Sequence, residues 1–351
     1  MKAAVLTGPE TFEIQELPAP KLKTGEVLVR VKACAICGTD LRIYRYGHSK
    51  IQYPAVIGHE VVGIVEKRGR GVSNRVETVP EGTWVMLTPG IPCGTCDNCL
   101  RGRFCTNKRS IGYHYPGGFA EQVVVPAHGV KSNLLPLPDP LPRGQEAGDY
   151  TLAEPLACTL NGLEQLGDLR FADSALIVGA GAVGVLLARL LLGRGLDKLA
   201  IADISADRLR LASRLLPGQV MGIQSRGDDL PAQTWDLTKG NGFDVVIVAC
   251  SSAEVQEQAV HLAALYGKIL FFAGLPPGQS SILFDSNTLH YRLASVHGTY
   301  GSTLYQNRRA MRLVASGFGR GIRDSSYPLE EINSAFRHAI SGKTLKATIE
   351  P

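Results

Sequence analysis

Four cysteines lie close together in the polar, glycine-rich segment PCGTCDNCLRGRFC: Cys93, Cys96, Cys99 and Cys105. Three thiols at C-x-x-C-x-x-C spacing, with a fourth nearby, can surround one tetrahedral zinc ion and leave no position open for water, which predicts a structural site. Two disulfides would need an oxidising compartment, and the surrounding pattern does not favour an iron–sulfur cluster. A closed zinc site would hold a loop that has few apolar side chains of its own.

A separate cysteine, Cys37, lies in the segment AICGTD, directly after the alternating run EVLVRVKACAI. With Cys34 it forms a C-x-x-C pair, but redox pairs of this spacing open a helix in a βαβ unit, whereas this pair ends an alternating strand. The alternation predicts that Cys34 lies in the core and that Cys37 lies at the strand end. If Cys37 binds a catalytic zinc ion, about two more protein ligands are needed, with one position left open.

Two other segments contain candidates for these ligands. His59 and Glu60 stand between a glycine and a strongly apolar strand in YPAVIGHEVVGIVEK, an unexpected place for two polar groups without a function. Glu154 precedes a proline at the start of the apolar helix pattern TLAEPLACTLNGLEQL. Each also has an ordinary structural interpretation, because a single buried histidine is usually a hydrogen-bonded core residue and the helix dipole favours a glutamate at a helix start.

A glycine turn follows the apolar run ALIV. Gly179, Gly181 and Gly184 have the spacing G-x-G-x-x-G between a predicted strand and a predicted helix. The first glycine permits the turn, the second lets a pyrophosphate approach the backbone, and the third lets helix and strand pack closely. We include Val183 of the same turn among the predicted cofactor-binding residues. A close-packed turn without a ligand is the structural alternative.

The predicted strand after this turn, LAIAD, ends at Asp203, 19 residues after Gly184. A carboxylate at this position can accept hydrogen bonds from the adenosine ribose and repels a 2′-phosphate, which favours NAD over NADP. Arg208 lies nearby and would weaken that preference, unless it stacks on the adenine or faces solvent. We therefore expect NAD as the cofactor.

The elements that must position these residues follow two patterns. Up to about residue 150, short β-type runs broken by glycine and proline predict an antiparallel β domain. From residue 174, apolar β-branched runs alternate with helical patterns, such as a helix over 253–267 before a strand over 268–274, which predicts a parallel sheet covered on both faces. Near the end, SAFRHAISGK followed by TLKATIEP predicts a helix that leads into a final strand.

The composition of the 351 residues is that of a globular protein, with 44% hydrophobic and 20% charged residues. The net charge of +5 comes from scattered Lys and Arg, and we interpret the densest cluster, KRGRG at 67–71, as a solvated turn, so no nucleic-acid partner is expected. No signal peptide and no membrane-spanning run is recognisable, which predicts a cytoplasmic protein without a membrane partner. The eight cysteines should then serve metal binding or catalysis.

In combination, CGTD, GHE, the four-cysteine segment, EPLA and GAGAVG with a strand-end aspartate resemble the zinc-dependent medium-chain alcohol dehydrogenases, most closely the branch of sorbitol and other polyol dehydrogenases. The resemblance covers essentially the whole chain, in order. It implies an α/β protein with a GroES-like catalytic domain over residues 1–150, completed by residues 286–351, and a Rossmann-type NAD-binding domain over residues 151–285. It also implies a homodimer or homotetramer.

The resemblance assigns roles to the residues around Cys37. Cys37 and His59 would bind the catalytic zinc ion, and Asp40 would fix the tautomer and orientation of His59. Glu154 stands where polyol dehydrogenases have a glutamate that binds zinc directly or through water. Glu60 matches a glutamate that binds zinc in some members and lies near it in others, and the sequence leaves open which glutamate binds at rest.

The chain departs from the family pattern in three places. Thr39 would contact the substrate hydroxyl and begin a proton relay, but Arg42 stands where many alcohol dehydrogenases have the histidine that ends it. The five residues between Cys99 and Cys105 are fewer than the family usually has, which implies a tighter loop. The turn EGTWV at 81–85 replaces the common GDRV, a change that we interpret as structurally neutral.

Further residues are expected near the bound cofactor and substrate. Because ligands of doubly wound sheets bind at the carboxyl ends of the strands, four residues should lie near the nicotinamide and its ribose. These are Cys250, Ser251, Gly274 and Leu275. Tyr44, His48 and Tyr113 are candidate substrate contacts, as is His114, and an ordinary packing or surface position is the alternative for each.

These observations predict a zinc-dependent oxidoreductase that transfers hydride from a secondary alcohol, most closely a polyol or sugar alcohol, to NAD and so forms a ketone. The expected cofactors are NAD and two zinc ions per chain, one catalytic and one structural. The alternative enzyme is a threonine-type amino-alcohol dehydrogenase, which shares CGTD, GHE and a glutamate at the third zinc-ligand position. A nucleotide-binding protein without zinc chemistry is the alternative class, and a zinc-lobe protein that binds nucleic acid is a more distant one.

Overall fold

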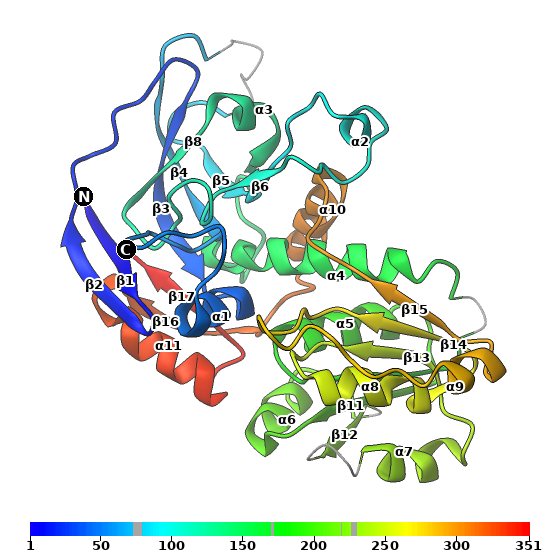
Figure 1. Ribbon diagram of the computed structural model, residues 1–351. Helices are drawn as coiled ribbons and strands as arrows, with labels where there is room; N and C mark the ends of the chain where they lie inside the picture. Colours follow the sequence, from blue (N-terminus) through cyan, green and yellow to red (C-terminus); the bar gives the residue numbers. More distant parts are fainter. Residues whose placement is uncertain (73–78, 170–171, 219, 226–229) are drawn as a thin grey trace. The chain divides into compact units, whose positions relative to one another are not determined.

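The computed structural model describes residues 1–72, 79–169, 172–218, 220–225 and 230–351 (Figure 1). These residues form two compact units. Unit 1 comprises Met1–Ala157 and Ser302–Pro351, and unit 2 comprises Cys158–Gly301. Unit 1 is therefore built from both ends of the chain, with unit 2 inserted between them in the sequence.

The main sheet of unit 1 has seven strands: β3 (Val27–Ala35), β4 (Glu60–Arg68), β5 (Trp84–Leu87), β8 (Gln122–Val125), β9 (Leu134–Pro136), β16 (Arg323–Pro328) and β17 (Lys346–Glu350). They follow the order β16-β17-β3-β4-β5-β9, and β8 also pairs with β3. All neighbours are antiparallel except β16 and β17, which are parallel. The predicted antiparallel domain is confirmed apart from that one pair, and β17 is the predicted final strand.

The other elements of unit 1 are short. Two strand pairs are separate from the main sheet: β1 (Lys2–Gly8) with β2 (Thr11–Glu16), and β6 (Gly90–Ile91) with β7 (Arg109–Ser110). The helices are α1 (Gly38–Tyr46), α2 (Asp97–Leu100), η2 (Ala127–Gly129), α3 (Val130–Asn133), η3 (Ala147–Leu152), α10 (Leu304–Ala315), η4 (Leu329–Glu331) and α11 (Ile332–Ser341). A further helix, α4 (Ala153–Gln165), begins in unit 1 and continues into unit 2.

An aromatic cluster forms part of the core of unit 1. The ring of Phe336 in α11 lies 4.8 Å from that of Phe12, 4.9 Å from that of Tyr44 and 5.8 Å from that of Phe119. The Tyr44 hydroxyl donates a hydrogen bond to the carbonyl of Glu10 at 2.7 Å. Tyr44 is thus a core residue that joins α1 to α11, which favours the packing interpretation over the predicted substrate contact.

Unit 2 contains a six-stranded parallel sheet: β10 (Ser174–Val178), β11 (Lys198–Asp203), β12 (Val220–Gln224), β13 (Phe243–Val248), β14 (Ala263–Phe271) and β15 (Ser295–Gly298). The order is β12-β11-β10-β13-β14-β15. Its helices are α5 (Ala182–Leu192), α6 (Ala206–Ser213), α7 (Leu230–Thr238), α8 (Ala253–Leu262) and α9 (Ser286–Tyr291). Because every residue of the central strand β10 is buried, the sequence there reads as a continuous apolar run.

The structure differs from the sequence prediction at one helix end. We predicted a helix over 253–267, but α8 ends at Leu262 and β14 begins at Ala263. The residues AALYG are apolar enough to continue a helix, yet they are drawn into the sheet because Phe243 of β13 pairs with Ala263. Tyr266 then adopts a positive φ of 61° where the strand is irregular. Pairing across the sheet has overridden a local helical pattern.

The boundaries between the units also lie later in the chain than the predicted 150/151 and 285/286. η3 packs on β3 and β4, so the chain up to Ala157 belongs to unit 1. β15 adds to the edge of the parallel sheet beside β14, so the chain up to Gly301 belongs to unit 2. Both shifts have the same cause, since a connecting segment belongs to the sheet against which it packs.

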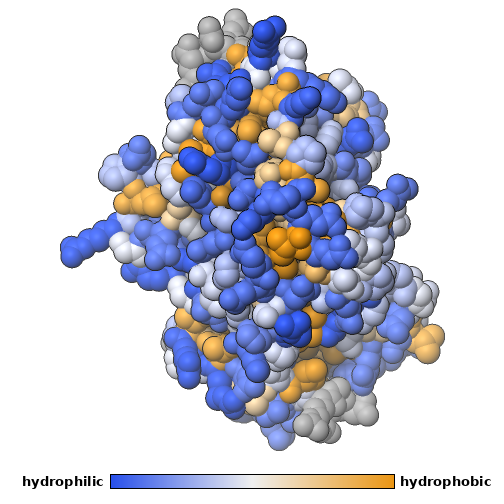
Figure 2. Space-filling model, turned by 90° about the vertical axis from the view of Figure 1, so that its left-hand side faces the viewer, coloured by the Kyte–Doolittle hydropathy of each residue, from blue (hydrophilic) through white to orange (hydrophobic). Residues whose placement is uncertain are grey.

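The surface carries mixed chemistry on the face drawn in Figure 2, where hydrophobic residues occur in small groups between hydrophilic ones. Among the described residues, no helix combines the length and the apolar character needed to cross a membrane.

Candidate functional site

The segment CGTD forms the turn that leads from β3 into α1. Cys37 is the residue that caps the start of α1, and its Sγ accepts a hydrogen bond from the backbone N–H of Thr39 at 3.5 Å. In return, Asp40 Oδ2 accepts a hydrogen bond from the backbone N–H of Cys37 at 2.9 Å. This reciprocal arrangement is a capping box, here with a thiol in place of the usual hydroxyl. It directs the Cys37 thiol to the end of the sheet while Cys34, in the strand, is fully buried in the core as predicted.

His59 is held by the same aspartate. Its Nδ1 lies 3.1 Å from Asp40 Oδ1, and both side chains are buried. Burial lowers the pKa of His59, but electrostatic interactions with Tyr113, Asp40 and Cys37 raise it well above its ordinary value. The predicted contact of Asp40 with His59 is present, and it leaves Nε2 as the ring atom that can bind a metal ion in place of a proton.

The glycine before His59 explains the motif GHE. Gly58 has a φ of +98°, and a Cβ there would lie 2.8 Å from the Sγ of Cys34 and 2.9 Å from the ring of Phe119. A larger residue would be strained and would clash with the core. The tight passage at Gly58 places His59 and Glu60, the first residue of β4, beside the end of β3.

Three predicted ligands meet at this point. One donor atom each from Cys37, His59 and Glu60 lies within 4.8 Å of the other two. A thiolate, an imidazole and a carboxylate are all ligands of zinc, and three protein ligands with one open position are typical of a catalytic site. The residues present therefore fit a catalytic zinc ion.

Sequence reasoning missed a buried lysine beside this group. Lys346 Nζ donates a hydrogen bond to Glu60 Oε1 at 2.6 Å and lies 2.5 Å from Oε2, yet Oε2 itself has no hydrogen-bond partner among the described residues. Glu60 is fully buried and Lys346 is 5% exposed. Burial raises the pKa of Glu60 to about 7 although the charge of Lys346 lowers it. The available signal was the lysine at the start of the final strand KATIE, whose other charged residue, Glu350, is its exposed last residue.

Glu154 lies in the first turn of α4 and is 8% exposed. Its carboxylate is not part of the 4.8 Å group, but its charge raises the pKa values of Glu60, Tyr113 and Lys346, in each case after larger causes led by burial. Glu154 is therefore near the group. Whether it binds the metal ion stays a prediction.

Two of the candidate substrate contacts form a wall beside His59. The ring of Tyr113 lies 5.4 Å from the ring of His59 and 5.5 Å from that of His48. Burial raises the pKa of Tyr113, so its hydroxyl is protonated. Burial, followed by the charges of Lys50, Arg42 and His114, lowers the pKa of His48, so its ring is neutral near pH 7.

The remaining candidate, His114, has a local role. Its Nδ1 accepts a hydrogen bond from the backbone N–H of Ser110 at 3.1 Å. This contact closes the turn that follows β7 and fixes the backbone next to Tyr113.

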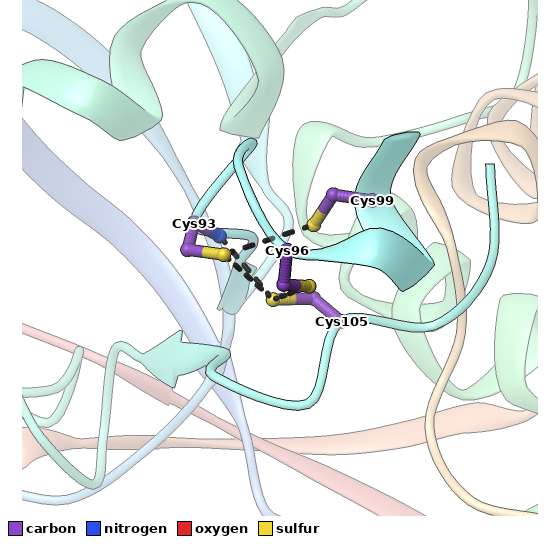
Figure 3. A group of neighbouring side chains, drawn as sticks. All are labelled: Cys93, Cys96, Cys99 and Cys105. Carbon is purple, nitrogen blue, oxygen red and sulfur yellow. Dashed lines mark hydrogen bonds between the residues drawn. The ribbon is translucent and has the colours of Figure 1, made fainter. Parts of the chain in front are cut away.

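The four clustered cysteines point their thiols toward one another (Figure 3). The Sγ of Cys93 lies 3.5 Å from that of Cys105 and 3.9 Å from that of Cys99, and the Sγ atoms of Cys96 and Cys105 are 3.9 Å apart. All four are free thiols, which argues against the disulfide alternative. Four sulfur atoms at the corners of a tetrahedron around zinc would be about 3.8 Å apart. The spacing therefore fits a single ion.

Hydrogen bonds prepare these thiols for a metal ion. Donation from the backbone of Thr95 and Cys96, and from the hydroxyl of Thr95, lowers the pKa of Cys93 to about 6. A bond from the backbone of Cys99 lowers the pKa of Cys96, whereas burial raises that of Cys99 to about 12. At neutral pH the group is part thiolate, the form that binds zinc, and part thiol.

The glycine turn of unit 2 has the conformation that its sequence predicts. Gly179 has a φ of +119°, and its N–H donates to the carbonyl of Ala202 at 2.7 Å. A Cβ on Gly184 would lie 1.9 Å from the carbonyl oxygen of Gly179, so only glycine allows α5 to pack this closely. A Cβ on Gly181, which caps α5, would meet nothing within 4 Å. The open space at Gly181 suits a pyrophosphate at the helix start.

Asp203 ends β11 and connects two turns. Its Oδ2 accepts a hydrogen bond from the N–H of Ala180, and its Oδ1 accepts one from the N–H of Ser205, both at 2.8 Å. The Ser205 hydroxyl caps α6 by accepting a bond from the N–H of Arg208 at 3.3 Å. Asp203 thus fixes the glycine turn, and its contact with a ribose stays a prediction.

The other predicted cofactor residues lie at the same edge of this sheet. Val183 is in the first turn of α5, Cys250 and Ser251 follow β13, and Gly274 and Leu275 follow β14. These strands are parallel to β10, so their carboxyl ends meet at the glycine turn. The arrangement is that of a dinucleotide site in an open parallel sheet.

Two family descriptions match the chain. Residues 23–139 match the family described as Alcohol dehydrogenase GroES-like domain, and residues 182–316 match the one described as Zinc-binding dehydrogenase. The first match contains the Cys37 group and the four cysteines. The second begins within the glycine turn and contains most of the parallel sheet.

Individual proteins are similar over most of their length. L-threonine 3-dehydrogenase of Pyrococcus furiosus is 33% identical over 328 residues, which cover 90% of this chain and 88% of that protein. D-altritol 5-dehydrogenase of Agrobacterium fabrum is 34% identical over 272 residues, covering 75% and 74%. A protein from Sinorhizobium meliloti 1021, described as a zinc-binding dehydrogenase and solved bound to NADP, has a TM-score of 0.82 and 26% identity, covering 100% of this chain and 99% of that one.

Proposed function

Because the chain belongs to the zinc-type medium-chain alcohol dehydrogenase family, we propose that it oxidises a secondary alcohol to a ketone and transfers the hydride to NAD. The observation that carries this proposal is the meeting of Cys37, His59 and Glu60 within 4.8 Å. The alcohol loses a hydride from carbon and a proton from oxygen, and the products are the ketone, NADH and a proton. The reaction is reversible.

A zinc ion bound at this group supplies Lewis-acid stabilisation of the negative charge on the substrate oxygen. The chain's own residues hold the ligands and move the proton. Asp40 fixes His59 through Nδ1. Thr39, in the first turn of α1, supplies the hydroxyl that accepts the substrate proton. Since the guanidinium of Arg42 cannot accept a proton in turn, we expect the proton to pass from Thr39 to water.

We propose a second, structural zinc ion at the four cysteines. The sulfur separations of 3.5 to 3.9 Å support it. The surrounding segment contains only short elements, α2 and the strands β6 and β7, so metal binding would supply stability that apolar packing cannot. The predicted count is two zinc ions per chain.

NAD is the proposed nicotinamide cofactor. Asp203 supports it, because a carboxylate at the end of β11 accepts bonds from ribose hydroxyls and repels a 2′-phosphate. The zinc-binding dehydrogenase from Sinorhizobium meliloti was solved with NADP, so both cofactors belong in the test. The ratio of kcat/KM for NAD to that for NADP should exceed one.

The proposed substrate is a polyol. A relative named for D-altritol supports it at 34% identity over 75% of the chain, although L-threonine 3-dehydrogenase matches at 33% identity over 90%. Both names specify a hydroxyl on an internal carbon, which is a secondary alcohol. Tyr113 and His48 beside His59 offer a hydroxyl and an imidazole that can bind the further hydroxyls of a sugar alcohol.

One observation favours the amino-alcohol alternative. After burial, electrostatic interactions with Lys50, Arg42 and His114 lower the pKa of His48. The pKa of His114 is also lowered, first by burial and then by the charges of Lys50, Arg109 and Lys108. Cationic groups beside the wall formed by Tyr113 and His48 would attract a substrate carboxylate. L-threonine carries such a group, whereas a polyol does not.

A substrate panel separates these proposals. Reduction of NAD at 340 nm would be measured with sorbitol, xylitol, inositol and L-threonine, each with and without a zinc chelator. We expect turnover of at least one polyol that the chelator abolishes. Turnover of threonine alone would replace the polyol proposal with the amino-alcohol one. Activity that survives both the chelator and Cys37→Ala would leave only the alternative of a nucleotide-binding fold without zinc chemistry.

We also propose that the chain forms homodimers or larger homo-oligomers through unit 2. Seven of the fifteen large hydrophobic residues that are exposed in the described chain lie between residues 265 and 300. This region includes β15, an edge strand of sequence SVHG that carries no proline, lysine or acidic residue. Unprotected edges of this kind pair with another strand, and a second copy of β15 running antiparallel supplies one.

A further inference from the structure

Two histidines of unit 1 are fixed in the same tautomer. The Nδ1 of His48 accepts a hydrogen bond from the backbone N–H of Lys50 at 3.0 Å, and the Nδ1 of His114 accepts one from the backbone N–H of Ser110 at 3.1 Å. A backbone nitrogen can only donate, so the hydrogen of each neutral ring lies on Nε2. Each ring therefore offers an Nε2–H donor to a ligand.

Both histidines are connected to the proposed zinc ligand His59 through Tyr113. The ring of Tyr113 lies 5.4 Å from that of His59 and 5.5 Å from that of His48, and His114 follows Tyr113 in the chain. The rings of His48 and His59 are therefore no farther apart than the sum of these two distances. A substrate whose hydroxyl is bound at His59 would extend along Tyr113 toward the two histidines.

Basic side chains act on both rings. After burial, electrostatic interactions with Lys50 and Arg42, together with His114, lower the pKa of His48, and Lys50 is the first of the basic groups that lower the pKa of His114. Among the described residues, none of the groups that shift these two pKa values is acidic. Lys50 is exposed, in a turn closed by a hydrogen bond from the N–H of Ile51 to the carbonyl of His48 at 2.9 Å.

These side chains offer hydrogen-bond donors and positive charge. The Nε2–H groups of His48 and His114, the ammonium of Lys50 and the guanidinium of Arg42 all donate. A phosphate monoester matches them, because its oxygens accept and its charge is about −1.5 to −2 at pH 7. An amino acid also brings a carboxylate, but the same cations would repel its ammonium group.

We propose that His48, His114, Lys50 and Arg42 bind the phosphate group of a phosphorylated sugar alcohol, and that such a compound is the substrate. The inference rests on the proposed function and makes its substrate class more specific. The reacting hydroxyl still loses its proton and the carbon its hydride to NAD, while the phosphate ester stays intact. Since Tyr113 contacts the rings at both ends, the phosphate lies several carbons from the reacting hydroxyl, a span that a pentitol or hexitol phosphate provides.

The first test compares each sugar alcohol with its terminal phosphate. The value of kcat/KM for NAD reduction is measured with sorbitol and sorbitol 6-phosphate, and with xylitol and xylitol 5-phosphate. We expect the phosphorylated member of a pair to have a kcat/KM about tenfold higher or more, the effect of one charge-assisted hydrogen bond. This preference should decrease as the salt concentration rises, because salt screens exposed charges.

The second test changes one exposed lysine at a time. Lys50→Gln should lower the ratio of kcat/KM for the phosphorylated to the plain sugar alcohol by about tenfold, and Lys50→Arg should keep it within about twofold. Lys67→Gln is the matched control, because Lys67 is also exposed but lies near the end of β4, whereas Glu60 begins that strand. The control should keep the wild-type ratio. Inorganic phosphate should inhibit sorbitol oxidation competitively, and less strongly in Lys50→Gln.

The outcomes distinguish this inference from the proposed function. Equal kcat/KM values for plain and phosphorylated sugar alcohols, or equal effects of Lys50→Gln and Lys67→Gln, would overturn the phosphate site and leave the dehydrogenase activity intact. A preference for a sugar acid such as gluconate would overturn the choice of a phosphate. Turnover of no sugar alcohol in either form would overturn the proposed polyol activity, and the inference with it.

Discussion

Asp40 orients two of the three residues, Cys37, His59 and Glu60, that form the candidate zinc site. One of its oxygens accepts a hydrogen bond from the backbone of Cys37, and the other lies 3.1 Å from His59 Nδ1. It is fully buried, so neither contact can be replaced by solvent. A single side chain thus orients one ligand through its backbone and another through its ring.

We predict that Asp40→Ala lowers the affinity of the catalytic site for zinc by about 10- to 100-fold, because the orientation of His59 is lost. The free energy of unfolding should fall by about 1–3 kcal/mol, since the cap of α1 is removed and buried N–H groups lose their acceptor. Zinc content after dialysis against a chelator and urea unfolding measure the two effects.

Gln306→Ala is the control for the capping contribution. Gln306 caps α10 by the same reciprocal arrangement, accepting a hydrogen bond from the N–H of Thr303 at 2.7 Å, but α10 carries none of the predicted zinc ligands. The Gln306→Ala variant should show a similar fall in the free energy of unfolding and should retain its zinc. Equal zinc loss in both variants would show that Asp40 acts only through the fold.

At the scale of the elements, the turn between β10 and α5 decides whether a dinucleotide can bind. Two of its glycines are required for different reasons. Gly184 has no room for a side chain, because the carbonyl of Gly179 lies where its Cβ would be, whereas Gly181 faces open space and has an ordinary φ of −76°. Gly184 is therefore needed for the fold, whereas we propose that Gly181 is needed for the ligand.

Two alanine substitutions should therefore differ. Gly184→Ala should lower the free energy of unfolding by about 3 kcal/mol and weaken NAD binding, since α5 must move from β10. Gly181→Ala should change the free energy of unfolding by less than about 1 kcal/mol but still weaken NAD binding, because its methyl group occupies the approach of the pyrophosphate. Thermal unfolding and calorimetric titration with NAD test this pair. Normal NAD affinity in a stable Gly181→Ala protein would contradict the predicted site.

At the scale of the whole molecule, the two edges of the parallel sheet differ. β15 lies in the region rich in exposed apolar residues, whereas the strand at the other edge, β12, exposes Met221. This contrast provides a test of the proposed oligomer.

Val296→Lys in β15 should convert the oligomer to smaller species, because a charge on the exposed side of an edge strand opposes pairing. Met221→Lys in β12 is the matched control and should leave the molar mass unchanged. The two side chains are 38% and 48% exposed, so each lysine can reach solvent without disturbing the monomer. Light scattering after size-exclusion chromatography gives the molar mass. An unchanged mass in Val296→Lys, or a monomeric wild type, would refute the interface.

Features that depend on neighbouring residues could be predicted from the sequence. The four cysteines lie within thirteen residues of one another, and the glycine turn needs only a strand, three glycines and a helix. The backbone geometry of such short segments follows from the residue types, so the grouping of the thiols and the conformation of Gly179 match the prediction. The identity of the bound metal ion and cofactor stays a prediction at both places.

Features that depend on sheet register could not be predicted in the same way. Tyr44 was a candidate substrate contact with a packing or surface position as the alternative, and only the structure shows that Phe336 of α11, from the far end of the chain, packs against it. Helix α8 ends early because the residues that follow it form strand β14, which pairs with β13. Lys346 meets Glu60 only because β17 and β4 flank the same strand, β3. Pairings between distant segments are set by the free energy of the whole sheet, which no local pattern of residues contains.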